Sequence, residues 1–96
     1  MVYRKKKYRS GSASYGYFQL EEEREHGKVF GFGSGNFIKL NDEFGNSWVG
    51  SCEPGEDNLI YYRFRGSNGG TLTGVSDNNG IILRDQRGRT FKGYVE

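Results

Sequence analysis

The segment IKLNDEFGNSWVG, at residues 38–50, is the clearest copy of a pattern that recurs along the chain. Apolar residues alternate with polar ones at its start, a turn ending in glycine follows, and a bulky apolar residue and a second glycine complete it. The pattern returns without a gap at residues 81–93, IILRDQRGRTFKG, and more loosely at residues 62–74, YRFRGSNGGTLTG. We expect a fourth, degraded copy at residues 18–31, with two extra residues in its turn. Repetition in one register favours duplication of a single unit, although hairpins in general need similar turns.

Each copy has the properties of a β-hairpin. Alternation places the apolar side chains of a strand on one face, and the internal glycine supplies the positive φ that a tight turn or an adjoining bulge requires. The last glycine marks a bulge or a close approach of two strands. The chain has 16 glycines and one proline, which disfavours helices because each glycine inside a helix costs about 1 kcal/mol relative to alanine. We interpret LEEEREH, at residues 20–26, as the charged end of a long hairpin.

These hairpins predict an all-β fold. In a chain of 96 residues they give about six to eight short strands, which must close or stack to hide their apolar faces and edges. We predict a small meandering antiparallel barrel, with a small β-sandwich as the alternative. Residues 17–96 form the single domain. Residues 1–16, a basic segment rich in serine, glycine and tyrosine, form a flexible tail, since they offer little to bury; the alternative is an edge strand at residues 2–8.

Composition narrows the class of protein. The chain lacks the run of about 18 apolar residues that a membrane helix needs, and no apolar segment follows its basic start as in a signal peptide. Cys52 is the only cysteine, which excludes an intrachain disulfide and a thiolate metal cluster and fits a reducing compartment. We therefore expect a cytoplasmic protein.

No segment carries a recognisable catalytic or metal-binding motif. His26 is the only histidine and lies in a predicted turn, while Cys52 is interpreted as a packing residue. The acidic segments do not follow the spacing of a calcium loop. The glycines of GFGSGN, at residues 31–36, lack the strand, helix and lysine of a phosphate-binding loop. We expect no enzymatic activity, no metal and no cofactor, and we place a hydrolase, or a barrel that encloses a small apolar ligand, behind a binding function.

Residues 27–40, GKVFGFGSGNFIKL, resemble the first strands of a cold-shock domain. The resemblance implies aromatic and glycine-rich strands that stack single-stranded bases. It is confined to these residues and departs from the family's spacing of lysine and aromatic residues, so it assigns no site residue.

Basic residues interleaved with aromatic ones give the strongest functional signal. In LIYYRFR, at residues 59–65, alternation places Tyr61, Arg63 and Arg65 on one face. A second set of cations follows near the C-terminal end, and a third lies in the tail. The predicted site consists of Tyr61, Arg63, Arg65, Arg84, Arg87 and Arg89, with Lys5, Lys6 and Lys7 added from the tail.

We predict a non-catalytic module that binds RNA or single-stranded DNA, with guanidinium groups on phosphates and Tyr61 on a base. The net charge is only +2, however, and the same cations suit an acidic protein partner or a membrane surface. The alternative is therefore an interaction or assembly subunit that docks a larger complex through its charged faces or recruits a strand at an open hairpin edge. The simplest alternative is that these cations only keep the surface soluble.

Overall fold

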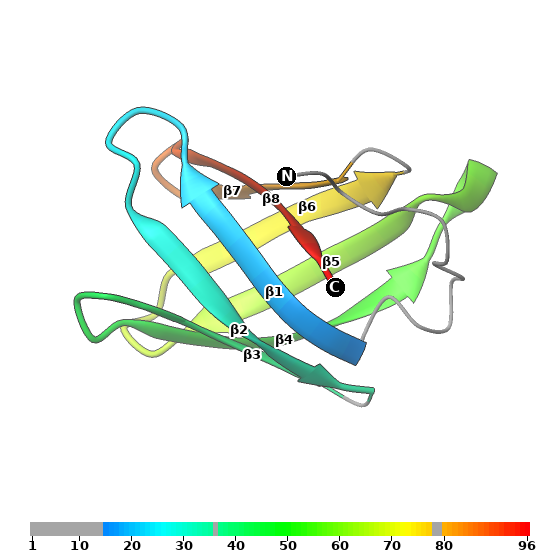
Figure 1. Cartoon of the computed structure of the whole chain (residues 1–96), viewed down its shortest axis with the longest axis horizontal. Helices are drawn as coiled ribbons and strands as arrows, with labels where there is room; N and C mark the ends of the chain where they lie inside the picture. The colour runs from blue at the N-terminus through cyan, green and yellow to red at the C-terminus, as the bar shows by residue number, and fades with distance from the viewer. Residues whose placement is uncertain (1–14, 36, 78–79) are drawn as a thin grey trace.

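The computed structural model describes residues 15–35, 37–77 and 80–96. The tail predicted for residues 1–16, with Lys5, Lys6 and Lys7, lies outside these ranges except for its last two residues, which begin the first strand. The strands are β1 (Tyr15–Glu22), β2 (Lys28–Ser34), β3 (Ile38–Asp42), β4 (Ser47–Pro54), β5 (Ile60–Gly66), β6 (Thr71–Asp77), β7 (Gly80–Asp85) and β8 (Thr90–Val95). A short 3-10 turn at Glu56–Asn58 links β4 to β5 (Figure 1).

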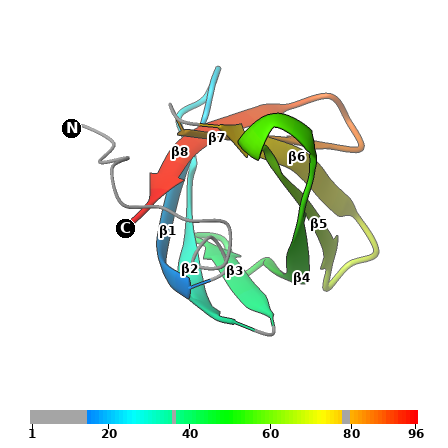
Figure 2. The ribbon, with the colours of Figure 1, turned by 90° about the vertical axis from the view of Figure 1, so that its right-hand side faces the viewer.

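The strands form a closed antiparallel barrel in which each strand pairs with the next along the chain. β8 closes the ring by pairing with β1, with Phe18 opposite Val95 and Leu20 opposite Gly93. Figure 2 shows the strands arranged around this ring. The predicted meandering barrel is confirmed and the sandwich alternative is excluded. Because every described strand has two neighbours, the open edge expected for strand recruitment is not available in this part of the chain.

Four hairpins share one register, as the sequence repeat requires. In each, an inward apolar residue of the first strand faces one of the second. These pairs are Leu20 with Val29, Leu40 with Trp48, Phe64 with Leu72, and Leu83 with Phe91. We expected two extra residues in the first turn, but the structure shows only one. Its closing bond runs from the Glu22 N–H to the Gly27 carbonyl, only one residue longer than the bond from the Asp42 N–H to the Asn46 carbonyl.

The last glycine of each hairpin lets the next hairpin approach closely. Gly74, for example, lies opposite Leu83, where an added Cβ would fall 2.8 Å from the Leu83 Cα and would overlap the Ile82 carbonyl oxygen. The same collision with backbone recurs at the other three positions, which are Gly31, Gly50 and Gly93. Of the two predicted roles for these glycines, the structure shows close strand packing.

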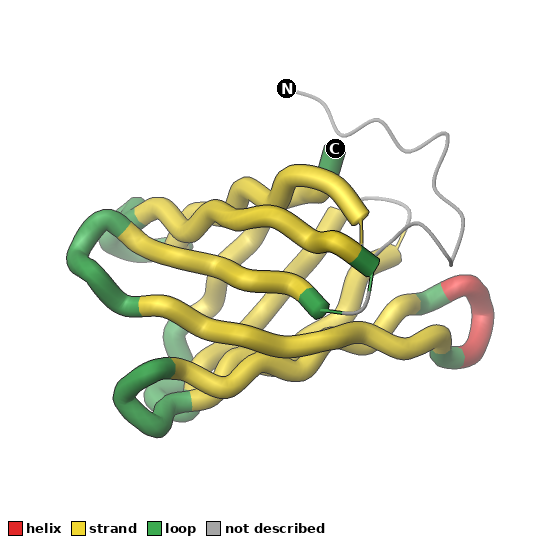
Figure 3. The backbone as a smooth tube through the Cα atoms, turned by 90° about the horizontal axis from the view of Figure 1, so that it is seen from below, coloured by secondary structure: helices red, strands yellow, loops and turns green. Residues whose placement is uncertain are grey.

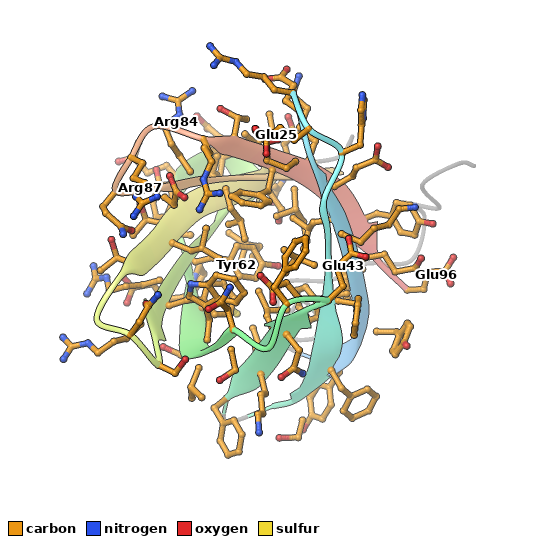
Figure 4. The ribbon with its side chains drawn as sticks, turned by 90° about the vertical axis from the view of Figure 1, so that its left-hand side faces the viewer. Glu25, Glu43, Tyr62, Arg84, Arg87 and Glu96 are labelled. Atoms are coloured by element: carbon orange, nitrogen blue, oxygen red, sulfur yellow. The ribbon has the colours of Figure 1, made fainter. Side chains whose placement is uncertain are left out.

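The barrel interior is filled by side chains from all eight strands. Phe18, Tyr62 and Phe64 are the large rings at its centre, each at most 3% exposed. The Tyr62 ring stacks on Phe64 at a centroid distance of 6.3 Å and meets the edge of Phe18 at 6.1 Å, and Figure 4 shows it inside the ring of strands. Cys52 is partly buried against this core, in agreement with its interpretation as a packing residue. The interior that a small apolar ligand would need is occupied.

The four hairpin turns gather at one end of the barrel, away from the 3-10 turn (Figure 3). Three of them are held by a carboxylate at the end of the first strand. Asp42 Oδ1 accepts hydrogen bonds from the N–H groups of Phe44 and Asn46, at 2.9 Å each. Glu22 and Asp85 occupy the equivalent places and accept bonds from their own turns. The carboxylates therefore satisfy turn donors that strand pairing leaves open.

Candidate nucleic-acid interface

Strand β5 presents a basic and aromatic outer face, as its alternation predicts. Its residues are buried and exposed in strict alternation, with Tyr61, Arg63 and Arg65 outward. The period of two decides this arrangement, because the other face carries Ile60 and two of the core rings. The predicted orientation of this strand is confirmed.

Arg84 joins these residues from β7. Thr73 of β6 lies opposite Arg63 on one side and opposite Arg84 on the other, so the two arginines are two strand spacings apart, about 10 Å. Arg65 lies opposite Thr71 in the next outward row. We call Arg63, Arg65, Arg84, Thr71 and Thr73 the arginine face. Figure 4 shows Arg84 pointing away from the barrel.

No carboxylate lies directly opposite an arginine of the arginine face. Ser51 and Val49 of β4 lie beside Arg63 and Arg65, and Thr90 of β8 lies beside Arg84. Within the described ranges, none of the three guanidinium groups forms an ion pair. All three are exposed, so their positive potential is not neutralised locally and is open to an anion.

Tyr61 is the outward residue of β5 that precedes Arg63, and its neighbours on β6 and β7 are apolar. It faces Val75 of β6 on one side and Glu53 of β4 on the other, and Ile82 follows beyond Val75. An added Cβ at Gly55 would strike the Tyr61 ring, so the loop after β4 covers part of that ring. Tyr61 remains 44% exposed, which leaves room for a stacked ligand.

The two predicted turn arginines behave differently. Arg87 is exposed in the turn between β7 and β8, whereas Arg89 turns toward the barrel end. The Arg89 Nε donates to Asp85 Oδ2 at 2.8 Å, and its guanidinium lies 5.9 Å from the centre of the Phe91 ring. Burial would raise the pKa of Asp85, but the bonds from Arg89 and Arg87 outweigh it and hold that pKa below its usual range. The structure therefore places Arg89 in a fold-stabilising contact, apart from the arginine face.

A second unusual surface lies on β1, β2 and the connection between β2 and β3, and the predicted site residues do not include it. We call it the aromatic face, and it consists of Tyr15, Tyr17, Phe30, Phe32 and Phe37, which are 56%, 49%, 38%, 58% and 51% exposed. The alternation in KVFGFGS, where Val29 is buried and the two phenylalanines are outward, was the available signal. Only the pairing of β1 with β2 brings the tyrosines and phenylalanines together.

No protein-family model, curated protein or solved structure matches this chain. Among the described residues, the helical segment falls far short of the length and apolar character needed to cross a bilayer. Function must therefore be read from the geometry and charge of the surface itself.

Proposed function

We propose that this protein is a non-catalytic cytoplasmic module that binds single-stranded nucleic acid, either RNA or single-stranded DNA, through the arginine face. Tyr61 would stack on a base beside it, and Lys5, Lys6 and Lys7 of the tail would add phosphate contacts. The observation that carries the proposal is the set of three outward arginines, separated by threonines and with no carboxylate directly opposite any of them.

The chemistry of this face suits a phosphate chain. A guanidinium group presents a planar fork of donors that matches two phosphate oxygens, and the hydroxyl groups of Thr71 and Thr73 can donate to phosphate oxygens between them. Arg63 and Arg65 are about 7 Å apart along β5, and Arg63 and Arg84 about 10 Å apart across β6. The exposed ring of Tyr61 favours an unpaired base, because stacking requires a base face that a duplex keeps covered.

Fluorescence anisotropy with a labelled single-stranded oligonucleotide tests the proposal. We expect binding that weakens between about 50 mM and about 200 mM salt, with each phosphate contact contributing about −0.7 to the slope of log K against log salt. Each of R63Q, R65Q and R84Q should weaken binding. Each should also make the salt slope less negative by about 0.7, the contribution of one phosphate contact. Arg24→Gln is the matched control, because Arg24 is also exposed but lies in the turn after β1.

Failure of the wild-type chain to bind RNA and DNA oligonucleotides at micromolar protein and low salt would refute the proposal. Equal losses for R24Q and R65Q would also refute it, because charge rather than the arginine face would then govern binding. Recovery of a stoichiometric protein partner that survives nuclease treatment, with no oligonucleotide affinity, would instead support an assembly subunit.

A further inference from the structure

We infer that the aromatic face is a base-stacking surface for the same single strand that the arginine face holds by its phosphates. The inference rests on the proposed function and extends it to a second, separate part of the barrel. It commits to unpaired nucleobases as the occupant of this face.

The concentration of exposed aromatic rings here is the first reason. Nine large hydrophobic side chains are exposed in the described part of the chain, and five of them form the aromatic face. Single exposed apolar residues are ordinary, but a contiguous patch marks a place where something binds. The barrel interior does not need these rings, because the inward residues of the same strands already fill it.

The rings are arranged as a strip across two strands. Tyr17 lies directly opposite Phe32, so their Cβ atoms are about 5 Å apart. Phe30 and Tyr15 extend the strip along the strands. Phe37 continues it into the next connection, where its carbonyl accepts a bond from the Ser34 N–H at 3.1 Å. Flat rings in one surface offer successive stacking positions.

The polar neighbours of the strip favour bases over a protein partner. Gln19 of β1 and Asn41 of β3 flank Phe30, and their amides offer both donors and acceptors to base edges. Lys39 lies opposite Phe32 and offers a charge to a phosphate. The outward positions of β1 and β2 hold no aliphatic residue. Stacking on nucleobases needs aromatic rings alone, whereas protein interfaces also bury other apolar side chains.

A continuous row of outward residues joins the two faces. Phe32 lies opposite Lys39, Lys39 opposite Val49, and Val49 opposite Arg65. Three spacings between neighbouring β-strands separate Phe32 from Arg65, about 14 Å. A single-stranded oligonucleotide of about 4–16 nucleotides, the site size of OB-fold barrels, can span this distance. On the other side of Tyr17 lies Glu96, held by backbone bonds of 2.9 Å in both directions. The Glu96 carboxylate repels phosphates, so we expect the bound nucleic acid to run from Tyr17 toward Lys39.

The test compares Phe32→Ala and Tyr17→Ala with Phe44→Ala. Phe44 is a matched control because it is also aromatic and is 77% exposed, but it lies in the turn between β3 and β4. For an oligonucleotide of about 12 nucleotides, F32A and Y17A should weaken binding about 5- to 150-fold. F44A should bind like the wild type, and the salt slope of F32A should stay unchanged. With an abasic strand of the same length, F32A and the wild type should bind equally.

The outcomes separate the two hypotheses. If the wild type binds and R65Q weakens binding while F32A and F44A match the wild type, the proposed function stands and the base-stacking inference is overturned. If the wild type does not bind at all, both fall. If sedimentation shows a dimer that F32A dissociates without any change in oligonucleotide affinity, the aromatic face is a self-association surface and the inference is overturned. Glu96→Gln should tighten binding, and a looser complex would contradict the proposed direction of the strand.

Discussion

The glycines that end each hairpin provide a direct test of how the barrel holds together. We predict that Gly74→Ala destabilises the protein by about 3 kcal/mol, because a Cβ there overlaps the backbone of β7 at the Ile82 carbonyl and the Leu83 Cα. Overpacking of a core by a methyl group costs about 1–3 kcal/mol when side chains can shift. Here the obstacle is a hydrogen-bonded strand, so the upper end of that range applies.

The predicted loss is a large share of the total stability. Domains of this length are stable by about 5–14 kcal/mol, and a loss of 1 kcal/mol lowers the melting temperature by about 4–8 °C in a domain of this size. Gly74→Ala should therefore lower it by about 12–24 °C. Gly27→Ala is the control: no atom lies within 4 Å of a Cβ added there and its φ is not in the left-handed region, so it should leave stability unchanged or raise it by about 0.4–1 kcal/mol.

Denaturant titration monitored by far-UV circular dichroism and by fluorescence measures both variants. Trp48 is the only tryptophan and packs against the core, so its emission reports on the barrel. A Gly74→Ala protein whose unfolding free energy lies within about 0.5 kcal/mol of that of Gly27→Ala would refute the reasoning. The close approach of successive hairpins would then not require glycine.

Three further predictions concern the turn end of the barrel. Asp85→Asn should lower the free energy of unfolding by about 1–3 kcal/mol, because it removes the negative charge of the buried carboxylate that pairs with Arg89. A denaturation midpoint equal to that of the wild type would contradict this. The pKa of Glu22 is lowered by the bond from the Glu25 N–H, and the pKa values of Asp42 and Asp85 are lowered by turn bonds that outweigh burial. These carboxylates should therefore contribute their full stabilisation above the unfolded-state pKa values near 4, and the free energy of unfolding should fall as pH drops below them. Urea titrations from neutral to acidic pH test this, and a midpoint that rises on acidification would show the opposite sign. His26→Gly should stabilise the protein by about 0.5–1 kcal/mol in thermal melts at neutral pH, because His26 has φ 63° at the place where other turns use glycine. A lower melting temperature would contradict this and would mean that the contact of His26 with Glu21, at 2.7 Å, outweighs the backbone strain.

Local patterns in the sequence determined the hairpin as the building unit. Alternation fixes which side chains of β5 face inward, because successive residues of a strand point to opposite faces whatever surrounds them. The turn glycines equally reflect a local need, since Gly45 and Gly88 adopt φ values of 93° and 88°. These features depend on residues close together in the chain, and they were predictable for that reason.

Contacts between residues far apart in the chain follow from the tertiary structure. The closure of β8 on β1 joins opposite ends of the described chain, whereas the sequence favoured a barrel but left two stacked sheets as an alternative. The sequence places Arg89 with Arg87 in the turn between β7 and β8, and only the structure shows that Arg89 pairs with the buried carboxylate of Asp85. The aromatic face depends on the pairing of Tyr17 with Phe32, which the true length of the first turn fixes. A one-residue error in that length shifts the register, and in a strand of period two such a shift changes which side chains meet.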